Sequence, residues 1–128
     1  MHHVLKVFKA LSDETRLRIL SLLLERECSV CEVMQAMIIS QSRASRNLGI
    51  LHDADLLKVR REGLWVLYSI DEESIKKFYP DLTGVVRGTL KDSEVATLDR
   101  ERLKTMVREG PCAERMKFLV EGNLNTRR

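Results

Sequence analysis

Residues 40–53 read SQSRASRNLGILHD, and this stretch has the pattern of a short amphipathic helix. Ala44, Leu48 and Leu51 recur at helical spacing and predict a buried face, while Ser40 is a typical helix N-cap. The opposite face carries small polar and cationic residues, namely Ser42, Ser45, Arg46 and Gly49. A helix with such an outer face is suited to contact a polar partner.

A second short helix is predicted directly before this stretch. Ser29 and Glu32 stand three residues apart ahead of an apolar run, which is the pattern of a capping box. This helix is expected to end near Met37, so that two residues separate it from Ser40. The sequence therefore predicts two helices joined by a tight turn.

Two stretches of β-type residues follow, at 57–60 and 64–70. Arg61, Glu62 and Gly63 between them predict a hairpin with glycine at its tip. A hairpin that directly follows a helix-turn-helix is a wing. We therefore expect a mainly α fold with a β-hairpin wing, the winged helix-turn-helix.

Two further helices are predicted upstream, the first over residues 4–11. Ser12 is the expected N-cap of the second helix and is followed by two acidic residues, which the helix dipole favours in a first turn. Apolar residues at helical spacing mark this as the main core helix: Leu17, Leu20, Leu23 and Leu24. Arg16 and Arg18 are expected to stay solvated.

Helical character returns after the hairpin. The expected segments are helices at 72–79, at 82–90 and from Asp92 or Ser93 to about Glu109, with an interruption at Pro80. A last short amphipathic stretch contains Cys112.

The composition is that of one small globular domain. The chain has 128 residues, of which 44% are hydrophobic and 32% charged; we place the domain at residues 1–122 and a flexible tail at 123–128. The apolar runs are too short to cross a bilayer, and no secretory signal is visible. We therefore expect a cytoplasmic protein without a membrane partner. In that reducing compartment its three cysteines are expected to be buried, metal-binding or redox-active rather than joined in a disulfide framework.

Positive charge is concentrated in the helix-turn-helix and wing. Residues 40–62 contain five basic and three acidic groups, an excess of +2 out of the total of +3. In a helix-turn-helix, the N-terminal part of the second helix enters the major groove of double-stranded DNA. The predicted DNA-contacting residues are therefore Ser40, Gln41, Ser42, Arg43, Ser45, Arg46, Lys58, Arg60 and Arg61.

These residues are expected to play different roles. Arg46 is placed to pair bidentately with a guanine, and its polar neighbours on the same face reach other base edges. Arg43 on the flank is expected to contact a phosphate of the DNA. Lys58, Arg60 and Arg61 on the wing are expected to contact the neighbouring DNA backbone or a minor groove. The alternative is that these are ordinary solvated charges.

Three blocks carry a resemblance to a known family: residues 8–20 (FKALSDETRLRIL), 40–48 (SQSRASRNL) and 56–70 (LLKVRREGLWVLYSI). In this order and spacing, the stretch from residue 4 to 70 resembles the ArsR/SmtB family of winged-helix metalloregulators. The resemblance implies a homodimer, built from the first and C-terminal helices, that represses its own operon from an operator until an effector binds. Candidates for the dimer face are Leu5, Phe8, Leu82, Val85 and Leu90, each of which fits an intramolecular core equally well.

The chain departs from the family's pattern in two places. Asn47 and Gly49 stand where the family commonly has a histidine and a basic residue. The turn before Ser40 also lacks the usual glycine and has Ile38 and Ile39 instead.

The cysteines suggest an effector. Arsenite-responsive members carry Cys-Val-Cys-Asp-Leu at the start of the third helix; here Cys31 matches the second cysteine, Ser29 replaces the first, and Cys28 is displaced by one residue. With Ser29 as N-cap, Cys31 lies in a first turn, where unpaired amides favour a thiolate, and Cys112 after Pro111 has a similar setting. Three thiolates suit a soft trivalent centre. We therefore expect As(III) or Sb(III) as the effector, bound by Cys28, Cys31 and Cys112, and no organic cofactor.

Other roles for the cysteines stay open. A Cys-x-x-Cys pair can oxidise, and a disulfide or polysulfide bridge to Cys112 would make a redox or sulfide sensor. Cys28 and Cys112 can also be ordinary packing residues. A small thiol-dependent enzyme is disfavoured because the chain lacks the βαβ setting and shows no acid/base pair or phosphate loop.

A zinc site is also disfavoured. Zinc in a structural site takes four ligands, and the histidines, His2, His3 and His52, stand at no recognisable spacing. His52 is expected to be an exposed residue at a helix end.

Overall fold

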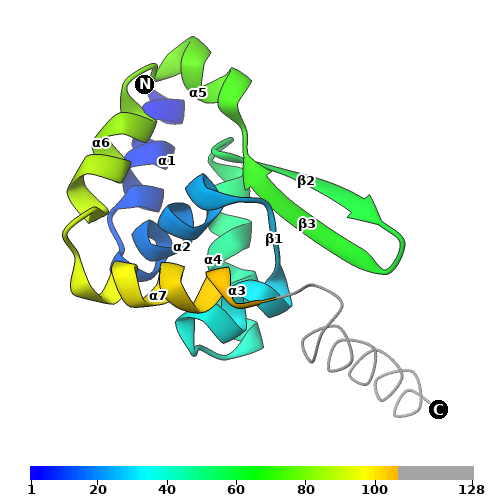
Figure 1. Cartoon of the computed structure of the whole chain (residues 1–128). Coiled ribbons are helices and arrows are strands. Elements are labelled where there is room, and N and C mark those ends of the chain that lie inside the picture. The colour runs from blue at the N-terminus through cyan, green and yellow to red at the C-terminus, as the bar shows by residue number, and fades with distance from the viewer. Residues whose placement is uncertain (107–128) are drawn as a thin grey trace.

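The structure, a computed structural model, describes residues 1–106. Its elements are α1 (His2–Leu11), α2 (Glu14–Glu25), β1 (Cys28–Ser29), α3 (Val30–Met37), α4 (Gln41–Asp53), β2 (Leu57–Glu62), β3 (Trp65–Ile70), α5 (Glu72–Phe78), α6 (Leu82–Leu90) and α7 (Glu94–Lys104). The helices form one body from which the β2–β3 hairpin projects (Figure 1). The predicted winged helix-turn-helix is confirmed. Cys112 and the predicted tail at 123–128 lie outside the described residues.

Helices α3 and α4 begin where the predicted capping residues stand. The Ser29 hydroxyl accepts a hydrogen bond from the Glu32 amide at 3.2 Å, and the Glu32 carboxylate accepts one from the Ser29 amide at 3.0 Å. This reciprocal pair is a capping box and satisfies two amides that the first turn of α3 leaves without helical partners. Ser40 caps α4 with a single hydrogen bond, since its hydroxyl accepts from the Arg43 amide at 3.2 Å.

The turn between α3 and α4 contains an unusual backbone conformation. Ile38 adopts a left-handed conformation with φ of 55°, and its amide donates to the Met34 carbonyl. Glycine adopts this conformation without a steric penalty, whereas a β-branched residue does not. The chain therefore keeps the tight turn although it lacks the glycine that usually forms it.

The wing belongs to a three-stranded antiparallel sheet with strand order β1-β3-β2. The hairpin is tighter than expected, because β2 continues to Glu62, which pairs with Trp65 at the start of β3. The turn therefore consists of Gly63 and Leu64 alone, and Gly63 has a φ of 61°. A two-residue turn requires a positive φ in its centre, which glycine supplies.

Strand β1 is absent from the sequence-based prediction. Cys28 and Ser29 pair with Tyr68 and Leu67 of β3. Two residues are too few to show the alternation that identifies a strand. The segment that carries Cys28 is therefore hydrogen-bonded to the wing.

Helix α2 lies at the centre of the core. Ile19 and Leu22 are fully buried, and Leu20 and Leu23 are buried as expected, whereas Leu17 is only half-buried. The predicted inner face of α4 is confirmed, since Ala44, Leu48 and Leu51 are all fully buried. The core thus forms between the central helix and the inner faces of α3 and α4.

The prediction that Arg16 and Arg18 stay solvated is wrong. Arg16 donates from Nε to the Ala10 carbonyl at 2.6 Å, and Arg18 donates from Nε to Asp99 at 2.8 Å. Asp99 lies far along the sequence, so no local pattern reveals this pairing.

Helix α7 is shorter than predicted. Ser93 is its N-cap, as expected, but the helix ends at Lys104 rather than near Glu109, and Thr105 is its C-cap. Helix α7 packs against α2 and α3. In residues 1–106 no helix is long and apolar enough to cross a membrane.

The N-cap of α2 is Asp13, one residue after the predicted Ser12. The Asp13 carboxylate accepts from the Arg16 amide at 3.2 Å, whereas the Ser12 hydroxyl donates back to the Phe8 carbonyl at 2.8 Å in the turn that ends α1. Both residue types cap helices, so the sequence alone does not distinguish them.

Exchanging each of these two residues for alanine separates their roles. We expect Asp13→Ala to lower the free energy of unfolding by about 1 kcal/mol, because a helix amide loses its acceptor. Ser12→Ala is the matched control and should change it by less than about 0.5 kcal/mol, since Ser12 is exposed. Urea denaturation followed by circular dichroism measures both, and a larger loss in Ser12→Ala would contradict the assignment.

Candidate nucleic-acid interface and cysteine segment

The residues predicted to contact base edges share one exposed face of α4. Gln41, Ser42, Ser45 and Arg46 are all exposed, while Ala44 is fully buried on the opposite face. Arg46 forms no ion pair with any residue in the range 1–106, so its guanidinium is available to a partner outside the chain. This face has the donors and acceptors that hydrogen-bond to base edges.

The N-terminus of α4 adds a second property to the same face. Ser40 is exposed, and its hydroxyl lies 3.4 Å from that of Ser42. Beyond the amide that Ser40 caps, the first turn of a helix offers further amides and the positive end of the helix dipole. Such a terminus favours a phosphate group.

Arg43 lies on the flank of α4, as predicted, and has an intramolecular contact there. Its Nη2 donates to the Thr15 hydroxyl at 2.7 Å, which ties α4 to α2. Arg43 is still an exposed residue. The structure therefore gives this side chain a part in holding α4 in place.

Asn47 faces the interior, which sequence reasoning missed. It is buried, its Nδ2 donates to the Arg43 carbonyl at 2.9 Å, and its Oδ1 accepts from Arg16 Nη1 at 3.0 Å. Because Arg16 also binds the Ala10 carbonyl, one guanidinium connects α1, α2 and α4. The position of Asn47 on the apolar stripe that contains Ala44 could have indicated its burial, and a buried amide requires hydrogen-bond partners.

The cations of the wing differ in their pairing. Lys58, Arg60 and Arg61 all lie on β2 and are exposed. Arg60 donates to both carboxylate oxygens of Glu27, at 2.8 and 2.6 Å, and to Glu62 at 3.1 Å. The hydrogen bond to Glu27 raises the pKa of Arg60 above its usual value. Within residues 1–106, Lys58 and Arg61 form no such ion pair and are available to an anionic partner.

Both cysteines of the described part are fully buried, in different surroundings. Cys28 belongs to the hydrophobic core, and its thiol donates to the Arg26 carbonyl at 3.4 Å. Cys31 lies in the first turn of α3, where Gln35 Nε2 is 3.8 Å from its sulfur. The Cys31 sulfur is in a disulfide bond. Among residues 1–106, no three Cys, His, Asp or Glu side chains gather as a metal site.

An ion pair spans the cysteine segment, residues 26–32, which carries Cys28 and Cys31. Arg26 Nη1 lies 2.5 Å from Glu32 Oε2, and the Glu32 side chain is almost completely buried. A buried carboxylate requires such a cation nearby. The pair therefore fixes the chain on both sides of Cys28 and Cys31.

The described histidines lie on other elements, His2 and His3 on α1 and His52 on α4. His52 is exposed at the end of α4, as expected. His3 lies 3.2 Å from Asp55 and 3.1 Å from the Tyr79 hydroxyl.

The predicted dimer face is exposed in part. Leu5, Phe8 and Val85 are 49%, 61% and 61% exposed, whereas Leu82 and Leu90 pack partly against the core. Helices α1 and α6, which carry these residues, lie on the same side of the body (Figure 1).

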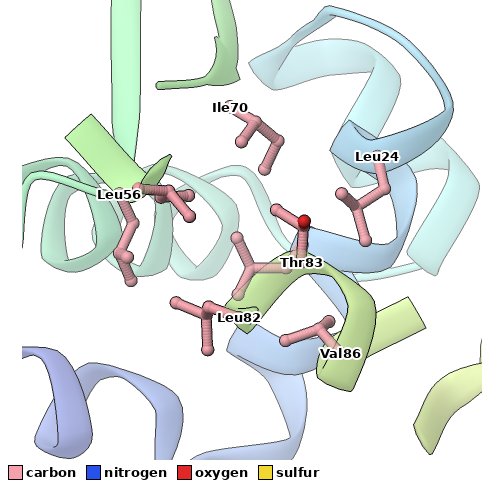
Figure 2. A pocket seen from close by; sticks show the side chains of 8 residues that line it. Leu24, Leu56, Ile70, Leu82, Thr83 and Val86 are labelled. Carbon is pink, nitrogen blue, oxygen red and sulfur yellow. The ribbon is translucent and has the colours of Figure 1, made fainter. Parts of the chain in front are cut away.

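Beside α6 is a small apolar pocket. Figure 2 shows Leu24, Leu56, Ile70, Leu82, Thr83 and Val86 around it. Its lining contains no charged side chain and no cysteine, so it offers no ligands to a metal ion.

Comparisons with known proteins agree with this fold. A family model described as "Bacterial regulatory protein, arsR family" matches residues 13–59. The chain is 41% identical over 96 residues to a cadmium resistance transcriptional regulatory protein, CadC homolog, of Staphylococcus aureus, covering 74% of each chain. It is 42% identical over 81 residues to the arsenic resistance transcriptional regulator ArsR1 of Pseudomonas putida, covering 62% of this chain and 63% of that protein.

A solved structure gives the same result. The homodimeric winged helix-turn-helix DNA-binding domain of Mb0332 from Mycobacterium bovis, described as a possible ArsR-family transcriptional regulator, matches with a TM-score of 0.61. The identity is 31%, and the match covers 73% of this chain and 82% of that one. These relatives and neighbours are transcriptional regulators rather than enzymes. The chain therefore belongs to the arsR family of bacterial regulatory proteins and is a transcriptional regulator.

Proposed function

We propose that the chain is a cytoplasmic, homodimeric repressor that binds operator DNA and is released when As(III) or Sb(III) binds its cysteine thiolates. The observation that carries this proposal is the position of Cys31, buried in the first turn of α3. Helix α3 leads through a three-residue turn into α4, the helix with the exposed polar face. A ligand on Cys31 therefore acts on the helix that precedes the DNA-contacting one.

The geometry of α4 and the wing supports DNA binding. The four residues that we assign to base edges lie on one exposed face, and the guanidinium that Arg46 brings to it forms no ion pair within residues 1–106. Lys58 and Arg61 on the wing are suited to phosphates, which supply most of the affinity in such complexes.

The exposed apolar residues on α1 and α6 support a homodimer. Leu5, Phe8 and Val85 present a hydrophobic surface that a second copy would bury. The related mycobacterial domain is described as homodimeric. A two-fold dimer presents two copies of α4 to a pseudo-palindromic operator.

The thiols fit a soft trivalent ion. Arsenite has three hydroxyl groups; when three thiols bind it, each hydroxyl leaves as water with one thiol proton, and three arsenic–sulfur bonds form. Cys28 and Cys31 supply two sulfurs from adjacent elements. Cys112, outside the described residues, is our candidate for the third. The relative from Pseudomonas putida, a regulator of arsenic resistance, agrees with this choice of effector.

Removing the Cys31 thiol tests the proposal. With the protein reduced beforehand by a phosphine, arsenite should release the parent from fluorescent operator DNA, as a fall in anisotropy. Cys31→Ser should bind the operator with parental affinity and need at least about 100-fold more arsenite, because the ion loses a sulfur ligand.

The matched control is His52→Ala. Because His52 is exposed at the end of α4 and takes no part in the hydrogen bonds described for Cys28 and Cys31, this variant should keep the full arsenite response. If arsenite released Cys31→Ser as readily as the parent, the proposal would be wrong. If His52→Ala lost its response to arsenite, a different set of ligands would bind the ion.

A second function is favoured by one specific observation, the disulfide at Cys31. A repressor whose operator affinity changes when Cys31 is oxidised would respond to peroxide or polysulfide instead of arsenite. The same anisotropy assay separates the two functions, since an oxidative switch responds to polysulfide without arsenite and is reversed by the phosphine.

A further inference from the structure

A buried carboxylate lies where α2, α3 and α7 meet. The Asp99 side chain on α7 has no exposed surface. Its Oδ2 accepts from Arg18 Nε at 2.8 Å, and its Oδ1 accepts from Arg18 Nη2 and Arg102 Nη2, each at 2.9 Å. One carboxylate therefore orients two guanidinium groups, one from α2 and one from α7.

Both guanidinium groups also reach the C-terminal end of α3. Arg102 Nε donates to the Ala36 carbonyl at 2.5 Å, and Arg18 Nη2 lies 3.4 Å from the Met37 carbonyl. These are carbonyls of the last helical turn, which the helix itself leaves without amide partners. Two positive charges there also match the negative end of the α3 dipole.

The end of α3 is the start of the turn into α4. Met37 is followed by Ile38 in its left-handed conformation, by Ile39, and then by the N-cap of α4. The amides of Ile38 and Ile39 both donate to the Met34 carbonyl. The direction in which α4 leaves α3 thus depends on this short turn. The carbonyls of Ala36 and Met37, which end α3 directly before the turn, are bound by arginines that Asp99 orients.

We propose that Asp99, acting through Arg18 and Arg102, is a positioning residue for DNA binding: it fixes the α3–α4 turn and therefore the angle at which α4 meets the operator. The proposal rests on the DNA-binding function proposed above and adds α7 to the elements on which it depends. A shift of α7 changes the position of both guanidinium groups and, with them, the α3–α4 turn.

Helix α7 has a second link to the body that provides a control. Arg100 donates to the Ser21 hydroxyl at 2.6 Å and to the Leu90 carbonyl at 3.3 Å. This arginine ties α7 to α2 and α6, and its hydrogen bonds do not involve α3. Arg100→Met should therefore weaken the attachment of α7 without changing the α3–α4 turn.

The test compares Asp99→Asn and Arg102→Met with Arg100→Met, at a temperature where circular dichroism shows each protein to be folded. We expect the first two variants to lower the ratio of operator to non-specific DNA affinity about 10-fold, with non-specific affinity unchanged. A residue that only stabilises the fold would leave this ratio at its parental value. Arg102→Met keeps the Arg18–Asp99 pair, so this variant alone can test the proposal if Asp99→Asn does not fold.

Hydrogen exchange provides a readout that is independent of DNA. The amides of Ile38 and Ile39 should exchange about 10-fold faster in Asp99→Asn and Arg102→Met, relative to amides of α5 in the same protein, and at the parental rate in Arg100→Met. Parental exchange at both amides in the two variants would overturn the proposal. If the parent binds no operator, the DNA-binding function fails, and the exchange rates still decide whether Asp99 fixes the turn.

Discussion

Arg46→Ala is expected to weaken operator binding by at least about 100-fold. A bidentate arginine–guanine pair contributes about 1–3 kcal/mol of discrimination, and a dimer on a two-fold operator makes this contact twice. Arg46 is exposed on α4 and forms no ion pair with the rest of residues 1–106, so its removal leaves no buried group without a partner. The fold should therefore keep its stability, and the loss should appear in binding alone.

Fluorescence anisotropy with operators that vary at single base pairs measures this effect. In the parent, one position of each half-site should strongly prefer guanine, and Arg46→Ala should lose that preference. Lys58→Ala is the informative comparison. Loss of a phosphate contact from the wing should weaken binding to all sequences alike and reduce the salt dependence of binding. An equal loss on every sequence in Arg46→Ala would show that Arg46 contacts phosphate instead.

Arg18→Met is expected to lower the free energy of unfolding by about 3 kcal/mol, the largest stability effect that we predict for a single substitution. Asp99 is completely buried, and Arg18 supplies two of the three hydrogen bonds that its carboxylate accepts. The hydrogen bond to Asp99 also raises the pKa of Arg18, which shows that the pair favours the charged form. Without Arg18, a buried negative charge keeps a single partner, Arg102.

Chemical denaturation of the double variant Arg18→Met/Asp99→Leu identifies the cause. Because it removes both charges, the double variant should regain part of the stability that Arg18→Met loses. Arg60→Met, which breaks the exposed pair with Glu27, should leave the denaturation midpoint unchanged. If the double variant were the least stable of the three, packing rather than charge would explain the effect of Arg18.

The parts of the fold that depend on neighbouring residues could be predicted from the sequence. The starts of α3 and α4 follow from Ser29, Glu32 and Ser40, because an N-cap bonds to amides within three residues. The same short range explains the error at the start of α2, where Ser12 and Asp13 are adjacent and only the folded chain shows which one accepts.

The parts that depend on distant residues could not be predicted. Arg16 binds an amide 31 residues away, and Arg18 a carboxylate 81 residues away. Strand β1 exists because β3 offers a partner for Cys28 and Ser29, which their own sequence does not show. The candidate DNA-contacting face could be predicted because it needs only helical periodicity, whereas the supports that hold it in place need the tertiary fold.

The pairing of β1 with β3 has a consequence for how such a regulator could be re-engineered. Cys28 and Ser29 are an edge strand of the same sheet whose other two strands form the wing. A change of backbone at these two residues is therefore transmitted to the hairpin through main-chain hydrogen bonds, whatever side chains they carry. Side chains exchanged at Cys28 and Ser29 would therefore lie on a strand that is hydrogen-bonded to the wing, whatever residues α4 carries.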